Sequence, residues 1–165
     1  MSDELRRDGA ALGVHLERDY HGTPEELWQC WTDPLRLARW LGIPAGPLLS
    51  GADPVRMVMG AGEDQWVEVR VLAADQPRTL KLAWDFPGQT GTELTVELIP
   101  LSHGRTRVVV DHDRLGGSAT GYGAGWQAFL EGGLRRETGG RADTAWEHRF
   151  TEALPAWRDR AAAVG

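Results

Sequence analysis

The chain has 165 residues, a formal net charge of -6 and a pI near 5.3. This length fits one domain, which would bury roughly 70% of the surface that its unfolded chain exposes. The acidic balance argues against a nucleic-acid backbone or an anionic membrane as the main partner, since both attract clustered Lys and Arg. The single cysteine, Cys30, excludes an internal disulfide, so the expected location is the cytoplasm.

The first residues carry little structural signal. Residues 1–11 are charged and have no apolar run of signal-peptide length, so they are predicted to form a disordered leader. No apolar stretch is long enough to span a bilayer, and we expect no membrane insertion. Residues 13–20 then alternate between apolar and polar side chains, which predicts a half-buried strand.

The next segment contains two helix-start signals in succession. Thr23 can cap a helix, Pro24 occupies the first helical position, and Glu26 completes a capping box. Asp33 and Pro34 repeat the arrangement of a cap followed by a proline. The pattern therefore predicts two short helices, at residues 25–31 and 35–41.

Beyond Gly42 the apolar residues recur at every second position. This period predicts five strands, at residues 54–59, 66–72, 79–86, 92–101 and 105–113. Short turns, including one at 60–64, would join them into an antiparallel meander. In the clearest strand, Leu82 and Trp84 share one face while Lys81 and Asp85 share the other. One face of the sheet should therefore be apolar and the other solvated.

A long helix is expected to follow the strands. Its apolar stripe recurs every three or four residues and consists of Tyr122, Trp126, Phe129, Leu130 and Leu134. The glycine-rich segment 121–125 is interpreted as a flexible entry to this helix. Gly132 and Gly133 indicate close approach to another backbone or a local bend, since each costs about 1 kcal/mol relative to Ala. Gly139 and Gly140 should end the element.

The last segment, residues 143–164, has helical spacing with Pro155 in its middle. Since proline cannot donate an N–H and restricts the residue before it, two helical pieces are expected to meet near Leu154. The predicted division is a leader at 1–11, one domain at 12–140 and a helical extension at 141–165. Packing of the extension on the outside of the same domain is favoured over two alternatives, in which it closes one end of the cavity or forms a homodimer contact.

Several of these signals, taken in order, resemble a known superfamily. They are Thr23 to Trp28, Trp31 to Pro34, Trp40, Leu80 to Trp84, Val110 to His112, Gly125, Trp126, Leu130 and Leu134. Their order and spacing over residues 12–138 resemble the START/Bet v 1-like (SRPBCC) superfamily, and within it the branch named for the activator of the heat-shock protein 90 ATPase.

The resemblance implies an α+β helix-grip fold. In this fold a curved antiparallel sheet wraps around a long C-terminal helix, two short helices follow the first strand, and a hydrophobic pocket lies between sheet and helix. Members of the superfamily include lipid carriers, polyketide cyclases, hydrolase-like proteins, stress proteins and co-chaperone domains. A fold with so many uses does not choose among them.

The apolar faces of the sheet and the long helix supply the candidate ligand-binding residues. They are Leu82, Trp84, Phe86, Val96, Val110, His112, Tyr122, Trp126, Phe129 and Leu130. Trp84 and Trp126 are the strongest of these, because both lie on the facing stripes. Trp28, Trp31 and Trp40 are assigned to core packing.

Catalytic signals are weak by comparison. His112 is the one candidate acid or base, yet Asp111 and Asp113 should point to the opposite face of its strand, so no triad forms there. Cys30 is expected to be a small buried hydrophobe. The five histidines, with one cysteine, show no ligand spacing, so we expect no metal site and no cofactor.

Three functions follow from these observations. The favoured one is binding of a hydrophobic small molecule between the sheet and the long helix, without catalysis. The first alternative is a cyclase, dehydratase or hydrolase that uses His112 with Glu68 or Arg70 if their strand phase allows. The second is a stress-related or co-chaperone interaction module, which the tail after Gly140 disfavours because it departs from the co-chaperone pattern. The sequence does not identify the ligand, the reaction or the oligomeric state.

Overall fold

The structure is a computed structural model that describes residues 2–60, 65–89, 91–142 and 144–165. Its elements in chain order are β1 (Asp3–Asp8), β2 (Ala11–His21), α1 (Pro24–Thr32), α2 (Pro34–Trp40), β3 (Ile43–Pro44), β4 (Val55–Val58), β5 (Trp66–Asp75), β6 (Thr79–Asp85), β7 (Glu93–Pro100), β8 (Arg105–Leu115), α3 (Ala119–Ala128), the π-helical η1 (Phe129–Leu134), α4 (Arg135–Glu137) and α5 (Trp146–Val164).

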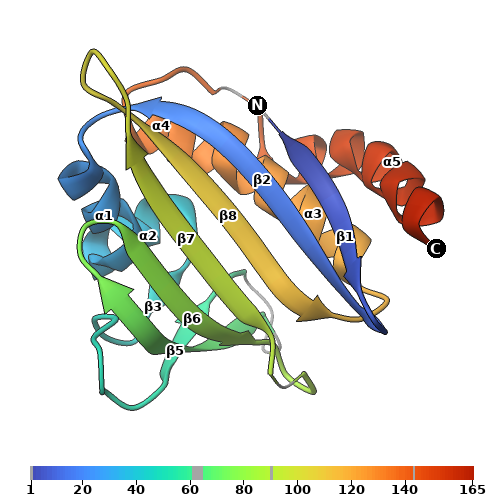
Figure 1. Ribbon diagram of the computed structural model, residues 1–165. Coiled ribbons are helices and arrows are strands. Elements are labelled where there is room, and N and C mark those ends of the chain that lie inside the picture. The colour runs from blue at the N-terminus through green and yellow to red at the C-terminus, as the bar shows by residue number, and fades with distance from the viewer. Residues whose placement is uncertain (1, 61–64, 90, 143) are drawn as a thin grey trace.

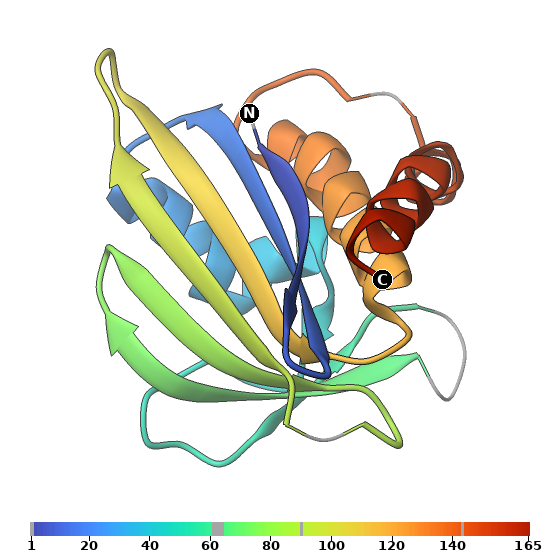
Figure 2. The same cartoon turned by 45° about the vertical axis from the view of Figure 1, so that its right-hand side comes forward.

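All the strands form one curved antiparallel sheet in the order β1-β2-β8-β7-β6-β5-β4-β3 (Figure 1). Helix α3 lies within the curve of the sheet, while α1 and α2 lie together at one end (Figure 2). The hydrophobic core fills the space between the sheet and these helices. This arrangement confirms the predicted helix-grip fold and the five predicted strands. Of the turn predicted at 60–64, residues 61–64 lie outside the described residues.

The two short helices begin where the sequence predicts. Thr23 Oγ1 accepts from the backbone N–H of Glu26 at 3.3 Å, and Glu26 Oε2 accepts from the N–H of Thr23 at 2.8 Å. Asp33 caps α2 by accepting from the N–H of Leu35 at 2.9 Å. Both caps satisfy N–H groups that lack a partner within the helix. The predicted capping box is therefore confirmed.

The prediction of a disordered leader is wrong for residues 3–8, which form β1 at the edge of the sheet (Figure 1). Only Leu5 enters the core, so the segment lacks the apolar alternation that predicts a strand. Backbone pairing with β2 and an ion pair between Asp3 and the buried Arg18 hold it instead. The two short helices consequently follow the second strand of the sheet.

The long helix consists of α3, η1 and α4 in continuous succession. Segment 121–125 lies inside α3, so its interpretation as a flexible entry is wrong. Packing explains the helical glycine at 123, because a Cβ there would lie 2.8 Å from Cε2 of Trp157. Of the two alternatives for Gly132 and Gly133, close approach to another backbone is confirmed, because a Cβ on Gly133 would lie 2.7 Å from the carbonyl oxygen of Trp40. Both glycines lie in the π-helical η1.

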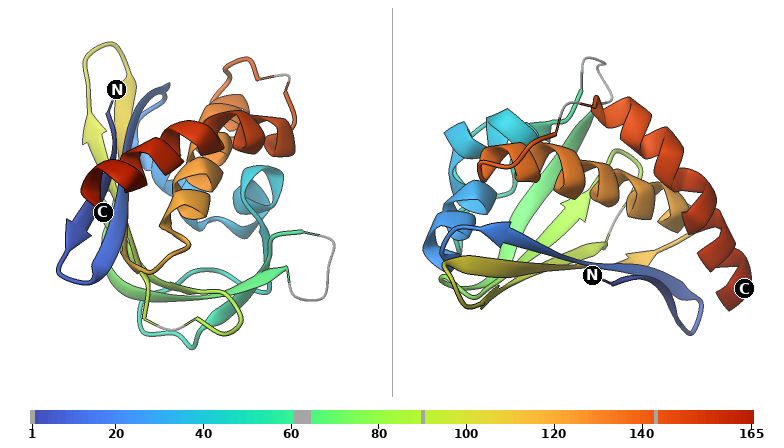
Figure 3. Two further views of the ribbon diagram at one scale, coloured as in Figure 1. Left: turned by 90° about the vertical axis from the view of Figure 1, so that its right-hand side faces the viewer. Right: turned by 90° about the horizontal axis from the view of Figure 1, so that it is seen from above.

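Helix α5 is one continuous helix through Pro155, so the predicted break near Leu154 is wrong. Pro155 and Thr151, one turn apart, are both exposed, and water can satisfy the carbonyl that the proline leaves free. The opposite side of α5 buries Trp157 against α3, and Trp157 Nε1 donates to Oε1 of Gln127 at 2.9 Å. Figure 3 shows α5 lying across α3, with its C-terminal end beside the edge strand β1. Tertiary packing thus outweighs the local cost of the proline.

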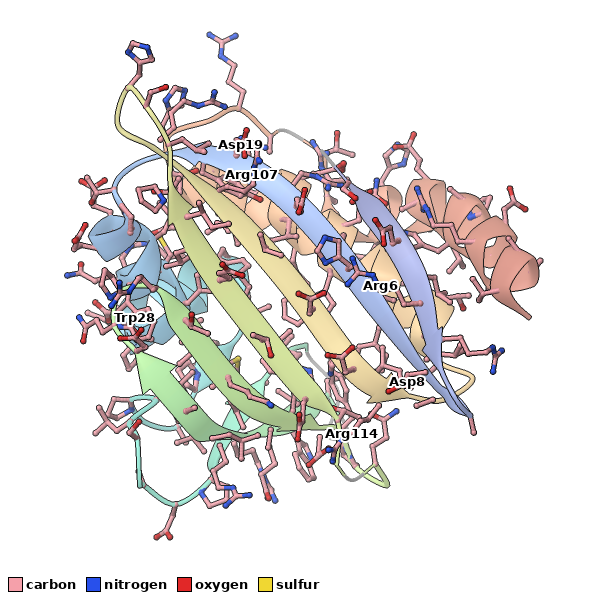
Figure 4. The ribbon with its side chains drawn as sticks, in the orientation of Figure 1. Arg6, Asp8, Asp19, Trp28, Arg107 and Arg114 are labelled. Carbon is pink, nitrogen blue, oxygen red and sulfur yellow. The ribbon has the colours of Figure 1, made fainter. Side chains whose placement is uncertain are left out.

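The outer face of the sheet carries charged side chains (Figure 4). Asp19 and Arg107 lie side by side on β2 and β8, with Arg107 Nε donating to Asp19 at 2.8 Å. This ion pair lowers the pKa of Asp19, although such exposed pairs contribute little to stability. Among the described helices, none is long and apolar enough to cross a membrane.

Candidate functional site

A pocket of about 270 Å³ lies where the end of β6 meets α3 and the beginning of α5. We call it the aromatic pocket. It is lined by Met59, Trp84, Phe86, Gln89, Ser118, Gly121, Tyr122, Gly125, Trp126, Phe129, Trp146 and Phe150. None of these described lining residues carries a charged side chain. Pockets that enclose small molecules are typically apolar with a few polar groups, and this one fits that type.

The structure divides the predicted ligand-binding residues into two groups. Those that line the aromatic pocket are Trp84, Phe86, Tyr122, Trp126 and Phe129. The others belong to the buried core behind it and do not line it, namely Leu82, Val96, Val110, His112 and Leu130. The sequence pattern thus identifies the inward face of each element. It does not show which inward side chains border a pocket and which fill the core between the sheet and the long helix.

Aromatic rings follow one another around the pocket wall. Ring centroids lie 5.3 Å apart for Trp84 and Trp126, 6.1 Å for Trp126 and Phe129, and 5.3 Å for Phe129 and Trp146. Trp146 and Phe150 are stacked at 5.0 Å with an interplanar angle of 17°. These distances suit favourable aromatic pairs. The wall therefore runs from the sheet across α3 and η1 to α5.

A hydrogen bond joins two lining residues of the pocket that are far apart in sequence. Tyr122 lies on α3, and its hydroxyl donates to Oε1 of Gln89 from the loop after β6. Phe86 lies beside Tyr122 with ring centroids 6.1 Å apart. Burial raises the pKa of the Tyr122 phenol to about 12. Tyr122 is therefore a neutral hydrogen-bond donor at neutral pH.

His112 lies directly behind the two tryptophans of the wall and is fully buried. Trp126 Nε1 donates to Nδ1 of His112 at 3.0 Å, so the imidazole proton belongs on Nε2. Nε2 then donates to Thr92 Oγ1 at 3.0 Å, and the Thr92 hydroxyl donates to the carbonyl oxygen of Trp84. Burial lowers the pKa of His112 to about 3. Both ring nitrogens are occupied, and the chain of hydrogen bonds joins the indole of Trp126 to the backbone of Trp84.

The remaining catalytic candidates lie away from the pocket. Asp111 bonds His15 on the outer face of the sheet, with Asp111 Oδ1 2.6 Å from Nδ1, and Asp113 is exposed, as strand alternation predicts. Glu68 and Arg70 are exposed on β5, so their strand phase directs them away from the core. Among the described residues, no group of three or more His, Cys, Asp or Glu side chains has the geometry to hold a metal ion.

Cys30 is buried in α1, and burial raises the pKa of its thiol to about 11. Arg36 donates to its sulfur at 3.1 Å, and this neighbouring guanidinium partly opposes the effect of burial. A thiol with this pKa is almost entirely protonated at neutral pH. The prediction that Cys30 is a small buried hydrophobe agrees with this environment.

The sequence leaves closure of one end of the cavity by the C-terminal tail as an alternative, and α5 does contribute to the pocket wall. The predicted ligand-binding residues do not include those that α5 and the loops supply. Trp146 and Phe150 are four residues apart, a helical spacing that was visible, but nothing in that spacing indicated which surface they face. Met59 ends the strand predicted at 54–59 and Gln89 lies in the turn after the strand predicted at 79–86, and the period-two pattern assigns neither residue to a pocket. Gly121 and Gly125 also line the pocket without a side chain, and no hydrophobicity pattern could find them.

Comparison with known proteins places the chain in a family. The sequence model described as "Activator of Hsp90 ATPase homolog 1-like protein" matches residues 21–138, which span α1 to α4 and most of the sheet. No curated protein shows significant sequence similarity to the chain. Helix α5, which completes the pocket wall, lies outside the matched residues.

Solved structures share the fold at low sequence identity. CalU16 from Micromonospora echinospora has a TM-score of 0.75 and 22% identity over 96% of this chain and 95% of its own. A conserved protein of unknown function from Enterococcus faecalis, EF2215, has a TM-score of 0.76 and 16% identity over 99% of this chain and 92% of its own.

A third similar structure carries a functional description. PFC0360w from Plasmodium falciparum, described as an HSP90 activator, has a TM-score of 0.59 and 20% identity over 72% of this chain and 90% of its own. At these identities the likeness shows the fold alone, whereas the family match covers most of the chain. The sequence resemblance to the activator branch is confirmed, and the chain belongs to the family of Activator of Hsp90 ATPase homolog 1-like proteins.

Proposed function

We propose that the protein binds a hydrophobic small molecule in the aromatic pocket. The observation that carries this proposal is a cavity of about 270 Å³ with an almost wholly apolar lining. Burial of apolar ligand surface yields about 25 cal/mol for each Å² removed from water, so such a wall favours an apolar occupant. The family match and the helix-grip fold support the same function, since both are compatible with a pocket between sheet and helix.

Catalysis is the weaker candidate, because the residue it depends on is already engaged. General acid–base catalysis requires a group that can exchange a proton near the operating pH. His112 accepts from Trp126 and donates to Thr92, and its pKa of about 3 keeps it neutral. Glu68 and Arg70 lie on the opposite face of the sheet. The interaction-module alternative rests on the family description alone.

A fluorescent probe tests the binding proposal. N-phenyl-1-naphthylamine is neutral and brightens in apolar surroundings, so its emission should rise when it is titrated into the protein. The blocking variant is Gly121→Leu, which would place a side chain where no protein atom lies within 4 Å of the new Cβ. Gly46→Leu is the matched control, because Gly46 has the same open surroundings but does not line the pocket.

The expected result is saturable brightening that Gly121→Leu abolishes and Gly46→Leu retains. Native mass spectrometry should show one probe molecule for each chain under the same conditions. No brightening, or equal brightening in the blocked variant, would rule out this pocket as the binding site.

A further inference from the structure

The shape and chemistry of the aromatic pocket narrow the class of molecule that it could hold. Its wall consists of aromatic rings from three parts of the chain, and the thioether side chain of Met59 also lines it. Rigid rings present flat surfaces, and aromatic pairs gain energy in stacked and edge-to-face arrangements beyond their buried area. Thioether sulfur also contacts aromatic rings favourably. Such a wall favours a flat aromatic ligand over a flexible chain.

Two glycines leave a flat strip of helix backbone on the pocket side of α3. Gly121 and Gly125 are one turn apart and both line the pocket. A Cβ on Gly121 would meet nothing within 4 Å, and one on Gly125 would make only an ordinary contact of 3.7 Å with Trp146. Gly123, in contrast, is required by its contact with Trp157. Packing within the protein therefore explains the glycine at 123 but not those at 121 and 125, which keep space in the pocket open.

The absence of basic side chains among the described lining residues narrows the ligand class further. None of the described lining residues is basic, and residues 61–64 and 90, which the structure does not describe, contain no Lys, Arg or His. An anionic ligand would therefore lose its hydration without gaining a cationic partner, and such burial is strongly unfavourable. The polar side chains of the lining can pair with a neutral hydroxyl instead: Ser118 and the amide N–H of Gln89 can donate, and the Tyr122 hydroxyl, whose proton goes to Gln89, can accept.

We propose that the aromatic pocket takes an uncharged, planar aromatic molecule of about two to three fused rings, placed between the aromatic wall and the glycine strip of α3. This inference rests on the proposed function and specifies its ligand class. The volume of about 270 Å³ lies below the range of typical drug-sized sites. It therefore limits the ligand to about two to three fused rings. A neutral hydroxyl on the ring would bond the polar side chains of the lining, Ser118, Gln89 and Tyr122.

Three probes of related size separate the classes. They are 9-anthracenemethanol, which is flat and neutral, 9-anthracenecarboxylate, which is the same ring with a negative charge, and 1-dodecanol, which is neutral and flexible. Each is titrated into the protein at pH 7.5, and isothermal titration calorimetry gives its Kd. We expect 9-anthracenemethanol to bind at least about tenfold more tightly than each of the other two.

The outcomes distinguish this inference from the proposed function. If 1-dodecanol binds as tightly as the neutral anthracene, the pocket is a general apolar site, and the inference fails while the proposed function stands. Equal binding of the carboxylate would also overturn the inference, because the pocket would then not select against charge. If neither the naphthylamine nor any of the three probes binds, the inference and the proposed function both fail.

The glycine strip supplies a second, structural test. Gly121→Ala and Gly125→Ala should each weaken 9-anthracenemethanol binding about tenfold, since one extra methyl group occupies the space of the ring. The same changes should raise the thermal midpoint by about 2 °C, because alanine favours a helix more than glycine does. Gly46→Ala is the matched control and should leave Kd unchanged. Unchanged binding in both helix variants would overturn the placement against α3.

Discussion

Replacing Gly123 with alanine should loosen the packing of α5 on α3. A Cβ at this position would overlap Cδ2 and Cε3 of Trp157 and would lie 2.8 Å from Cε2. Carbon atoms pack best at about 3.5–4.0 Å, so either the indole or the helix must move. The indole has little freedom, since it is fully buried and its N–H is bonded to Gln127 at 2.9 Å.

The size of the effect follows from two opposing contributions. Overpacking a well-filled interior costs about 1–3 kcal/mol, and a rigid ring places this site near the upper end. Alanine gains about 1 kcal/mol over glycine in a helix interior. The expected net loss is about 2 kcal/mol, which lowers the thermal midpoint of a chain of this length by about 4–8 °C. Urea unfolding followed by circular dichroism measures the same loss.

Gly121→Ala is the matched control on the same helix, because its Cβ meets nothing within 4 Å. It should be neutral or stabilising, whereas Gly123→Ala destabilises. A double-mutant cycle with Trp157→Ala should then show that the cost of Gly123→Ala disappears once the ring is gone. Equal unfolding midpoints for the two glycine variants, or an unchanged cost without the indole, would refute the packing argument.

Three further predictions concern single side chains. Since the pKa of His112 is about 3 in the folded state and near 6.5 when unfolded, only the unfolded chain gains its proton between these values. The free energy of unfolding should therefore fall by about 1.4 kcal/mol for each pH unit of acidification. His112→Gln cannot titrate, so its urea midpoint should change less with pH between about 6.5 and 4.5 than that of the unmutated protein. An equal slope in both proteins would contradict this. Pro155→Ala should raise the free energy of unfolding by about 1–3 kcal/mol, because alanine supplies the helical N–H that Pro155 lacks inside α5; calorimetry showing a lower midpoint would count against it. Cys30, with its buried thiol of pKa about 11, should react with iodoacetamide at pH 8 far more slowly in the folded protein than in urea, and equal rates would show the thiol to be accessible.

The fold could be predicted to a large extent because its signals are local. The capping box at Thr23, the proline at 34 and the alternation through residues 79–86 each depend on neighbours within a few positions. Strand β1 escaped prediction because its charged sequence supplies a single buried residue, Leu5. Its stability comes from pairing with β2, which no local pattern contains.

The candidate site was predictable only in part, for a related reason. Alternation in β6 and the helical stripe of α3 identify inward faces, and they correctly bring Trp84 and Trp126 together, with ring centroids 5.3 Å apart. An inward face can meet either a packed neighbour or a cavity, and the sequence does not distinguish these. Thus Leu82 and Val96 share the inward face of the wall residues, yet they are core residues behind the pocket.

The sequence by itself determined the order of the elements from β2 to α4, apart from the two-residue β3, and the family of the chain, because caps, turns and hydrophobic periods act over short distances. Only the tertiary structure decided where the space between them stays open. That outcome depends on how α5 crosses α3 at Gly123 and on the side chains that Trp146 and Phe150 add to the wall. A cavity is what packing leaves unfilled, so its position is a property of all the surrounding elements together and of none of them alone.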